Sequence, residues 1–396
     1  MCSSPIKEGQ VLQGLAGALQ GAAERVRRAA DRADPRPTAQ RQVRAAAIAA
    51  SRSISTDDVR RRVAQWPRRL PPGGLREAVV THFAEPFAAS RPFSAWTTTG
   101  FGAAIHVDSA DLIGRTILVS GRWEPSVGTC VQALLRPGDS FLDVGANIGY
   151  YTLLAARCVG AGGFVRAFEP SLTLWMALRA NLAANGLADD IALRVAVLDK
   201  DGSVVVLEGP AANRGVTRVV GADQAAAGQA GFGSAVAAVP LDVAAAGLPP
   251  YRPLTIKMDI EGAERAASEG LERLVAAVEE VALIIEITPA RLTGDGVPRA
   301  VGEDEVARAV SAGSDRGGSD TGEAQWLFDL ADRQRMTIWL IPNGYSAAQR
   351  FRSRPQPPVP VEAPVRGQAD YLLVRGDILL SRLGDVAGTA RRRRRG

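Results

Sequence analysis

A glycine-rich stretch over residues 141–151 carries the clearest chemical pattern in the sequence. Its apolar start predicts a strand that ends near Asp143, and Gly145 and Gly149 predict a tight loop before a helix. Glycine is expected here because a side chain would fill the space of a ligand, while bare backbone N–H groups can approach it closely. The spacing Gly-x-x-x-Gly, with Asn147 at its centre, is neither the dinucleotide pattern Gly-x-Gly-x-x-Gly nor a phosphate loop with Gly-Lys-Ser/Thr. The loop therefore predicts a nucleoside ligand without phosphates.

An acidic residue follows the next predicted strand. In nucleotide-binding folds a carboxylate roughly 20 residues past the first glycine holds the ribose hydroxyls, and Glu169 stands in that place, after the strand predicted over 164–168. A carboxylate accepts two hydrogen bonds from a diol but repels a phosphate. Asp143 and Glu169 together therefore predict an uncharged or cationic nucleoside. A third strand, predicted over 191–195, leads into Ala196, whose small side chain is suited to lining an adenine slot.

Acidic residues also follow the strand predicted over residues 254–258. Ligands of a doubly wound sheet lie at the carboxyl ends of its strands, so Asp259 and Glu261 are expected at the mouth of the site. One carboxylate raises the pKa of its neighbour by like-charge repulsion, which suits a general base. Glu286, at the end of the next predicted strand, is a third candidate for this base. Two alternatives stay open: Glu261 as a charge at a helix N-terminus, and Lys257 as the ion-pair partner of Asp259.

Four other side chains near these motifs are open between a functional and a structural role. Tyr150 and Tyr151 follow the glycine loop and either cover a ligand or pack in the core, of which the core is favoured. For Glu124, in the segment 121–125, the sequence favours neither the functional nor the structural role. His106 is expected as a surface or packed histidine rather than as a base.

Taken as a set, these motifs resemble the FkbM family of S-adenosylmethionine-dependent methyltransferases. The resemblance covers roughly residues 100–290 and implies a class I methyltransferase fold. That fold is a Rossmann-like α/β fold with a seven-stranded, mostly parallel sheet and a late antiparallel strand. The resemblance also implies methylation of a hydroxyl oxygen, often on a sugar or a secondary metabolite. The segments that carry it are 121–125, 143–151, 168–170, 181–185 and 256–264.

The same resemblance implies roles for single residues toward S-adenosylmethionine. Asp143, Gly145 and Asn147 would lie along its methionine and ribose parts. Glu169 would hold the ribose hydroxyls, and Ala196 would lie near the adenine. No metal ligand is predicted. The residues predicted to bind the cofactor are, in full, Asp143, Gly145, Asn147, Gly149, Glu169, Ala196 and Asp259, and the predicted catalytic residues are Asp259, Glu261 and Glu286.

The elements that must position these residues follow from hydrophobic periodicity. Short β-type runs alternate with helical stretches from about residue 100 onward, which predicts an α/β fold with a mostly parallel sheet and helices on both faces. Periodic apolar residues predict N-terminal helices over 10–33 and 56–66. A β-hairpin is predicted from strands over 103–107 and 115–119. Further strands are predicted over 140–144, 164–168, 191–195, 204–207, 254–258, 281–287, 337–341 and 371–374, and helices over 126–135, 148–158, 171–185, 262–276 and 323–335. Long surface loops are predicted over 210–238, 290–322 and 353–368.

These elements predict four parts of the chain. An N-terminal helical extension is expected over 1–74 and a lead-in with the β-hairpin over 75–130. The methyltransferase domain is expected over 131–380, followed by a disordered basic tail over 381–396.

Composition restricts the classes of protein further. Lys and Arg number 47 against 42 Asp and Glu, and the five arginines at 391–395 account for the whole excess of +5. The body is therefore neutral, so no nucleic-acid partner is expected. Three cysteines without paired spacing and two histidines offer no disulfide framework or zinc knuckle and favour a reducing compartment. No apolar run reaches membrane-spanning length, so we expect a cytoplasmic protein without membrane insertion.

The sequence thus predicts an S-adenosylmethionine-dependent O-methyltransferase that acts on a small-molecule or glycan hydroxyl by in-line displacement, with Asp259 as the favoured base. Neither the acceptor nor the oligomeric state follows from the sequence. One alternative is a methyltransferase of the same fold that acts on RNA or protein. It is disfavoured because Asp-Ile-Glu follows the fourth strand in place of an Asn-Pro-Pro-Tyr element. The other alternative is a non-enzymatic nucleoside-binding scaffold.

Overall fold

The computed structural model describes residues 44–45, 47–48, 56–207, 210, 214, 217–221, 234–249, 251–260, 262–287, 322–344, 350–351, 354–365 and 368–384. The chain divides into two compact units. The first holds the helices up to residue 121, and the second holds Trp96–His106 and the sheets and helices that follow residue 122. The helix predicted over 10–33 lies outside the described residues, as do residues 290–321 of the loop predicted over 290–322.

The described part of the first unit is mostly helical. The helix predicted over 56–66 is confirmed as α3. Apolar side chains line the interior of this unit, where the rings of Phe83 and Phe87 stack with centroids 5.9 Å apart. The helical segments are α3 (Asp57–Gln65), η1 (Trp66–Arg69), α4 (Gly74–Val79), η2 (Val80–Ala84), α5 (Glu85–Ser90) and α6 (Leu112–Ser120).

The strand predicted over 115–119 is wrong, because this segment lies in helix α6. The helix begins after Asp111, whose Oδ2 accepts a hydrogen bond from the backbone N–H of Gly114 at 2.8 Å. It ends at Gly121, which adopts a left-handed φ of 78° and donates its N–H to the carbonyl of Ile117. These two caps satisfy backbone groups at both helix ends. They outweigh the strand preference of a β-branched run.

The predicted hairpin exists with a different first strand. β1 (Ser94–Thr98) pairs with β2 (Ala104–Asp108), so the strand predicted over 103–107 is confirmed as the second one of the hairpin. The turn is closed by Thr99, whose N–H donates to the carbonyl of Ala103 at 2.8 Å and whose Oγ1 accepts from the Ala103 N–H at 2.9 Å.

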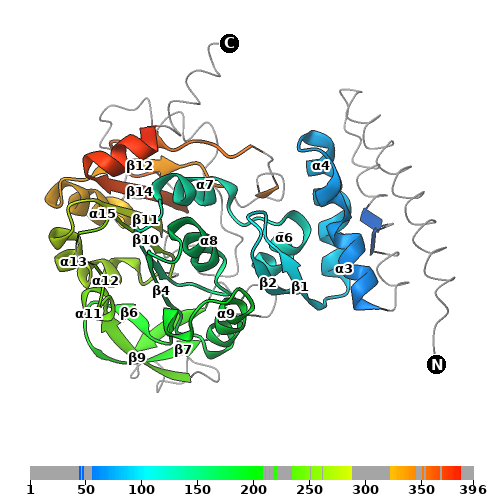
Figure 1. The fold of residues 1–396 in the computed structure, drawn as a ribbon, viewed down its shortest axis with the longest axis horizontal. Coiled ribbons are helices and arrows are strands. Elements are labelled where there is room, and N and C mark those ends of the chain that lie inside the picture. The colour runs from blue at the N-terminus through cyan, green and yellow to red at the C-terminus, as the bar shows by residue number, and fades with distance from the viewer. Residues whose placement is uncertain are drawn as a thin grey trace, which may run out of the picture. The chain divides into compact units, whose positions relative to one another are not determined.

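The main sheet of the second unit has eight strands in the order β13-β12-β14-β11-β10-β3-β4-β5 (Figure 1). Neighbours run parallel from β5 to β11, while β14, β12 and β13 pair antiparallel. This confirms the predicted class I methyltransferase-like fold with a late antiparallel strand. The sheet has eight strands rather than seven because a two-residue strand containing Pro360 adds an edge, where proline is tolerated. The strands are β3 (Ser140–Val144), β4 (Phe164–Phe168), β5 (Ala192–Leu193), β10 (Leu254–Met258), β11 (Val281–Ile287), β12 (Thr337–Ile341), β13 (Val359–Pro360) and β14 (Ala369–Arg375).

Strand order determines where a ligand fits. From β3 to β5 the sheet grows in one direction, and from β10 to β11 it grows in the other. Right-handed crossovers then bring helices to both faces, and the reversal between β3 and β10 is the switch point at which open α/β sheets bind ligands. The helices are α7 (Pro125–Leu134), α8 (Tyr150–Val159), α9 (Leu172–Ala184), η3 (Asp189–Ile191), α11 (Leu241–Ala244), α12 (Glu264–Glu269), α13 (Glu272–Ala277) and α15 (Gly322–Arg333) (Figure 1).

A second sheet corrects the surface loop predicted over 210–238. Strands β8 (Arg218–Gly221) and β9 (Ser234–Pro240) lie in this range, and they join β6 (Ala196–Leu198) and β7 (Gly202–Leu207) in the order β6-β9-β7-β8. Alternate residues of β9 are buried, but of Val236, Ala238 and Pro240 only the first has a β-branched side chain, so the strand pattern is weak in the sequence. The strand predicted over 191–195 shrinks to the two residues of β5, and the chain then enters the second sheet.

Residues 381–384, predicted to begin the disordered tail, are helical instead, and Leu383 is fully buried. Arg382 anchors this helix by an ion pair of 2.5 Å with Asp139. The remaining tail, 385–396, lies outside the described residues.

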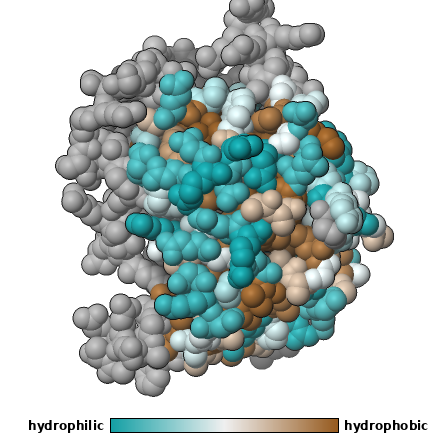
Figure 2. Space-filling view, turned by 90° about the vertical axis from the view of Figure 1, so that its left-hand side faces the viewer, coloured by the Kyte–Doolittle hydropathy of each residue, from teal (hydrophilic) through white to brown (hydrophobic). Residues whose placement is uncertain are grey.

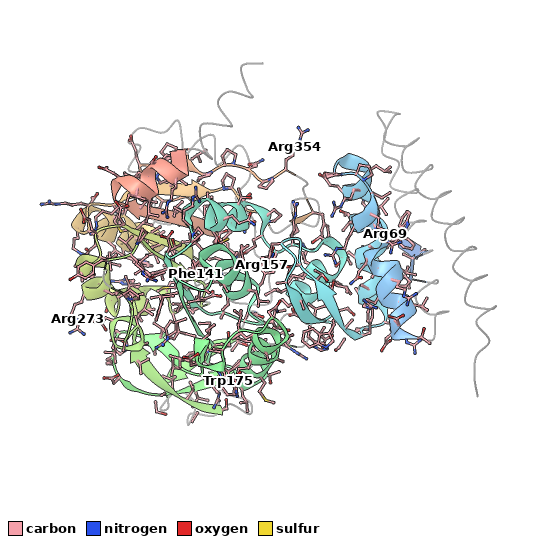
Figure 3. The ribbon with its side chains drawn as sticks, in the orientation of Figure 1. Arg69, Phe141, Arg157, Trp175, Arg273 and Arg354 are labelled. Carbon is pink, nitrogen blue, oxygen red and sulfur yellow. The ribbon has the colours of Figure 1, made fainter. Side chains whose placement is uncertain are left out.

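The core of the second unit lies in the central strands. Every residue of β3, β10 and β11 is buried, as expected for strands covered on both faces. Figure 3 contrasts Phe141 of β3, which lies among the interior side chains, with Arg273, which points outward. Asp143, Lys257 and Glu286 are the charged residues of these three strands. Burying a charge is costly unless it is paired, so these three residues need partners.

The surface is more hydrophilic than the core. On the face in Figure 2, hydrophilic residues cover much of the described surface, and hydrophobic residues gather in smaller groups between them. Within the described residues, no helix combines the length and the apolar character that crossing a membrane requires.

Candidate active site

The two glycines of the loop after β3 are required by packing inside the protein. Gly145 has a left-handed φ of 82°, and a Cβ there would overlap the backbone carbonyl oxygen of Asp259. Gly149 has a φ of 90°, and a Cβ there would lie 2.5 Å from the side chain of Leu178. The expectation that glycine leaves room for a ligand stays a prediction, and packing within the protein is a second reason for these glycines. Gly145 lets the ends of β3 and β10 approach each other.

The backbone N–H groups of this loop are bonded within the protein. Those of Gly145 and Ala146 both donate to the carbonyl of Phe168, at 3.0 and 3.1 Å, and that of Gly149 donates to Ala146 at 2.8 Å. The Ile148 N–H donates to Oδ1 of Asn147 at 2.7 Å. A phosphate-binding loop needs several N–H groups aimed at the anion. The bonding of this loop agrees with the predicted exclusion of phosphate.

Glu169 is held rigidly beside the glycine loop. Its Oε2 accepts from the backbone N–H of Asn147 at 2.8 Å, and its Oε1 accepts from that of Ser171 at 2.9 Å. Ser171 also caps α9 through its Oγ, which accepts from the Leu174 N–H at 3.2 Å. The carboxylate predicted to hold a ribose is thus fixed at the carboxyl end of β4, and Asn147 lies directly against it.

Asp143 has one oxygen in use and one without a partner. Its Oδ2 accepts from the hydroxyl of Thr152 at 2.6 Å. Its Oδ1 is buried with no hydrogen-bond partner among the described residues. Burial raises the pKa of Asp143, and the charge of Lys257 counteracts this rise. A buried carboxylate oxygen without a donor is costly, so this atom fits a donor or a positive charge supplied by a ligand.

Buried Lys257 forms an ion pair with the partly buried Asp259, which confirms the open alternative for Lys257. The Nζ of Lys257 lies 2.8 Å from Oδ2 of Asp259 and 4.8 Å from the centre of the Tyr151 ring. Burial lowers the pKa of Lys257, but the charges of Asp259, Glu124 and Asp143 outweigh it and raise that pKa above its usual value. Lys257 therefore stays charged, and Asp259 enters the site as half of an ion pair. Tyr150 and Tyr151 are both buried, in agreement with the favoured core role.

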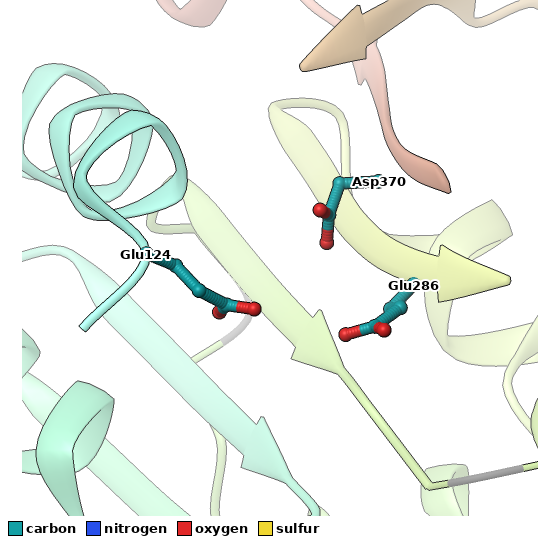
Figure 4. A group of neighbouring side chains, drawn as sticks. All are labelled: Glu124, Glu286 and Asp370. Carbon is teal, nitrogen blue, oxygen red and sulfur yellow. The ribbon is translucent and has the colours of Figure 1, made fainter. Parts of the chain in front are cut away.

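Glu286 lies in a cluster that the sequence did not predict. It is buried, and strand pairing sets it opposite Asp370 of β14. Together with Glu124 these residues bring carboxylate oxygens within 4.8 Å of one another (Figure 4). The Nδ2 of Asn343 bridges two of them, at 3.2 Å from Oε1 of Glu124 and 2.9 Å from Oδ2 of Asp370. The Tyr151 hydroxyl donates to Oε2 of Glu124 at 2.9 Å.

Several of these residues were missed in the sequence. Asp370 immediately precedes the predicted strand 371–374. Because that strand is antiparallel, its beginning lies at the edge where the parallel strands end. A polar residue just before an antiparallel strand is thus a usable signal. Asn343 lies after β12 on a loop, and nothing in its surroundings in the sequence marks it.

Glu264 is a further titratable group that sequence analysis did not select. Burial raises its pKa from 4.5 to about 7, although its Oε1 accepts the Gly262 N–H at 2.8 Å. Its charge also interacts with Asp259, which lies five residues earlier in the chain. Glu261, one of the predicted bases, lies outside the described residues.

Two asparagines of the segment 181–185 connect the loop to the hairpin. Asn181 donates through Nδ2 to the carbonyl of Ile148 at 2.8 Å and accepts through Oδ1 from the N–H of His106 at 2.7 Å. One turn later, Asn185 exchanges two hydrogen bonds with the backbone of Ala104, at 2.9 and 2.7 Å. Both side chains therefore position the loop through α9.

Ala196 lies elsewhere than expected. It is the first residue of β6, pairs with Ala238 of β9 and packs in the apolar core of the second sheet. The adenine contact predicted for it stays a prediction.

Fold and site together define the class of the protein. The switch point between β3 and β10 brings Asp143, Glu169 and Asp259 to one edge of a class I methyltransferase-like sheet. Residues 143–311 match the family model described as the methyltransferase FkbM domain. This match covers most of the motifs by which the sequence resembles that family.

The chain is also similar to solved structures. One is a SAM-dependent methyltransferase from Aquifex aeolicus, at 10% identity over 64% of this chain and 91% of that chain, with a TM-score of 0.31. A second is a precorrin-6y C5,15-methyltransferase from Geobacter metallireducens, at 11% identity over 63% of this chain and 88% of that chain, with a TM-score of 0.28. A third is a SAM-dependent O-methyltransferase from Thermotoga maritima, at 11% identity over 70% of this chain and 77% of that chain, with a TM-score of 0.29. At these identities and TM-scores, none of them assigns an acceptor to this chain. No curated protein matches it.

Proposed function

We propose that this chain transfers the methyl group of S-adenosylmethionine to a hydroxyl oxygen of a sugar or other small metabolite. The observation that carries the proposal is the buried Oδ1 of Asp143, which has no hydrogen-bond partner among the described residues. It lies at the carboxyl end of β3, at the switch point of the sheet, and Glu169 is fixed nearby by two backbone N–H groups. These features suit a donor with a ribose diol and a positive charge.

The residues that would hold the donor are the predicted set. Asp143 and Glu169 supply carboxylates, and Gly145, Asn147 and Gly149 shape the loop between them. Ala196 and Asp259 complete the set. Bound S-adenosylmethionine supplies a methyl group already activated by its sulfonium leaving group. The protein must hold the acceptor oxygen in line with this methyl and exclude water.

The hydroxyl proton of the acceptor needs a base. Asp259 is the favoured one, because it lies at the end of β10, next to the loop, and is only partly buried. Lys257 holds this carboxylate in place through the 2.8 Å ion pair. Glu261 and Glu286 remain the other proposed bases. A hydroxyl acceptor fits a carboxylate-rich site, because a carboxylate can accept its proton directly.

Partner, location and domain boundaries belong to the same proposal. The neutral charge of residues 1–390 supports a small-molecule or glycan acceptor and no nucleic acid. Three cysteines without paired spacing support a cytoplasmic location. The boundaries proposed from the sequence are 1–74, 75–130, 131–380 and 381–396.

Calorimetric titration of the full chain with S-adenosylmethionine tests the proposal. We expect Asp143→Asn and Glu169→Gln each to weaken binding about 10- to 100-fold, since each loses a charged hydrogen-bond partner. Glu272→Gln is the matched control, because Glu272 forms an exposed ion pair with Arg333 and should bind the donor as the wild type does. Unchanged affinity in both site variants would refute the assignment. Mass spectrometry of metabolite extracts incubated with labelled donor then identifies the acceptor by its gained methyl group.

A further inference from the structure

Four side chains form a continuous chain of contacts that ends at the proposed base. The Nζ of Lys257 lies 2.8 Å from Oδ2 of Asp259 and 4.8 Å from the centre of the Tyr151 ring. The Tyr151 hydroxyl in turn donates to Oε2 of Glu124 at 2.9 Å. The contacts therefore run from a buried glutamate to Asp259, whose side chain is 25% exposed.

The backbone of Glu124 is strained. Its φ of 41° and ψ of 72° lie in the left-handed region, which a residue with a Cβ adopts at a cost. It precedes Pro125, the first residue of α7, but among the described residues its side chain does not cap that helix. The side chain is turned inward instead, and Glu124 is 5% exposed. Strained residues cluster at functional sites, so this conformation indicates a role for the inward carboxylate.

Tyr151 is held at both ends of its side chain. It lies in the first turn of α8, directly after the glycine loop, and is 4% exposed. The ring of Tyr150 meets its ring edge to face, with centroids 5.3 Å apart. The hydrogen bond to Glu124 fixes the hydroxyl. The position of the Glu124 carboxylate therefore determines where the face of the Tyr151 ring lies.

The ammonium of Lys257 is attracted from two sides. A cation within about 6 Å of the centre of an aromatic ring is attracted by the face of that ring, and the carboxylate of Asp259 attracts the same group. Burial lowers the pKa of Lys257, but the neighbouring carboxylates, led by Asp259 and Glu124, outweigh burial and raise it. Lysine carries its charge on a flexible stem, so these contacts are what define one place for the Nζ.

We propose that Glu124 and Tyr151 are positioning residues for methyl transfer. Glu124 fixes the ring of Tyr151, and this ring holds the Lys257 ammonium against the proposed base. The inference rests on the proposed function, in which Asp259 accepts the proton of the acceptor hydroxyl. A general base must lie within hydrogen-bond reach of that proton, and a small misplacement of a catalytic group lowers the rate strongly. Both positioning residues act through Lys257 and need no contact with the acceptor.

Nuclear magnetic resonance of the lysine ammonium groups tests this arrangement without donor or acceptor. The chain contains three lysines, so isotope-labelled lysine gives at most three ammonium signals. The signal that is missing in Lys257→Arg belongs to Lys257. A buried, hydrogen-bonded ammonium exchanges its protons slowly, whereas the side chain of Lys200 is 83% exposed. We expect the wild type to show a protected Lys257 signal that is shifted by the Tyr151 ring.

Tyr151→Phe keeps the ring and loses the hydroxyl, so it should lose the protected signal and its ring shift. Tyr371→Phe is the matched control. Tyr371 is 1% exposed, its hydroxyl oxygen accepts the Val365 N–H at 2.9 Å, and its ring meets that of Phe328 edge to face. This control should keep the wild-type signal. A wild type without a protected Lys257 signal, an unchanged signal in Tyr151→Phe, or an equal loss in both variants overturns the proposal.

Two substitutions of Glu124 provide the rescue experiment. The amide oxygen of Glu124→Gln can still accept the Tyr151 hydroxyl, so this variant should keep the Lys257 signal, while Glu124→Ala should lose it. An equal loss in the two variants overturns the route through the hydroxyl. Thermal unfolding shows which variants are folded, and the comparison of Tyr151→Phe with Tyr371→Phe does not depend on Glu124→Ala.

Rates of methyl transfer connect the arrangement to function. With labelled donor and the acceptor identified by its gained methyl group, Tyr151→Phe should lower kcat about 10- to 100-fold, the effect of misplacing a catalytic group. Its calorimetric Kd for the donor should stay at the wild-type value, and Tyr371→Phe should keep the wild-type kcat. An unchanged kcat in Tyr151→Phe overturns the positioning role while the proposed function stands. A wild type that transfers no methyl group refutes the proposed function, and the Lys257 signal still decides the arrangement.

Discussion

Glu264 is expected to make the stability of this protein fall as the pH rises through neutrality. Burial raises its pKa from 4.5 to about 7 in the folded chain. The folded state therefore binds this proton more tightly than the unfolded state does. The stabilising contribution of this proton to the free energy of unfolding is fully present below about pH 4.5 and is lost as the pH rises to about 7. At 1.36 kcal/mol per pKa unit, the rise corresponds to about 3 kcal/mol.

Glu264→Gln tests this expectation, because the amide is neutral at every pH and its Oε1 can still accept the Gly262 N–H. Urea unfolding at about pH 4.5 and about pH 8, on either side of the titration, gives the free energy of unfolding of each protein. The wild type should lose about 3 kcal/mol more than Glu264→Gln between these two pH values. At the higher pH the variant should be the more stable protein.

The control for this comparison is Glu272→Gln, since Glu272 is a partly exposed glutamate whose loss leaves the titration of Glu264 intact. It should show the same pH dependence as the wild type. If Glu264→Gln and the wild type lose the same free energy over this range, the buried Glu264 does not titrate near neutrality, and the reasoning fails.

Two further substitutions test the packing of the site. Gly145→Ala should destabilise the fold by several kcal/mol, because its Cβ meets the Asp259 carbonyl. Gly138→Ala, at a φ of 91° with no atom within 4 Å of the added Cβ, should cost only about 1–2 kcal/mol of backbone strain. Equal losses of unfolding free energy would contradict the close contact. Lys257→Met should cost about 3–5 kcal/mol by leaving buried carboxylates uncompensated, whereas Arg273→Met, in an ion pair whose arginine is 82% exposed, should cost less than about 1 kcal/mol. Similar stability of these two variants in urea unfolding would show that Lys257 is not needed for charge balance.

The sequence by itself determined the central strands. β3, β4, β10, β11 and β12 coincide with their predicted ranges residue for residue. Each is a short, mainly apolar run bounded by turn residues, and this pattern is local to the sequence. The strand ends also located Asp143, Glu169, Asp259 and Glu286, since ligands meet the carboxyl ends of such strands.

Tertiary structure decided the elements whose local signal is weak or mixed. Segment 115–119 has a strand-like composition, but the caps at Asp111 and Gly121 make it a helix. β8 and β9 lie in a stretch rich in alanine and glycine, where side chains carry little pattern, and only pairing with β6 and β7 makes them strands.

The same division holds for the site. The sequence determined which carboxylates end the strands, because that depends on local pattern alone. Only the antiparallel register of β14 brought Asp370 opposite Glu286, and only the fold brought Glu124, Asn343 and Gln368 to the same place. Contacts between residues far apart in the chain depend on how strands pair and pack, and a local pattern contains no information about that pairing.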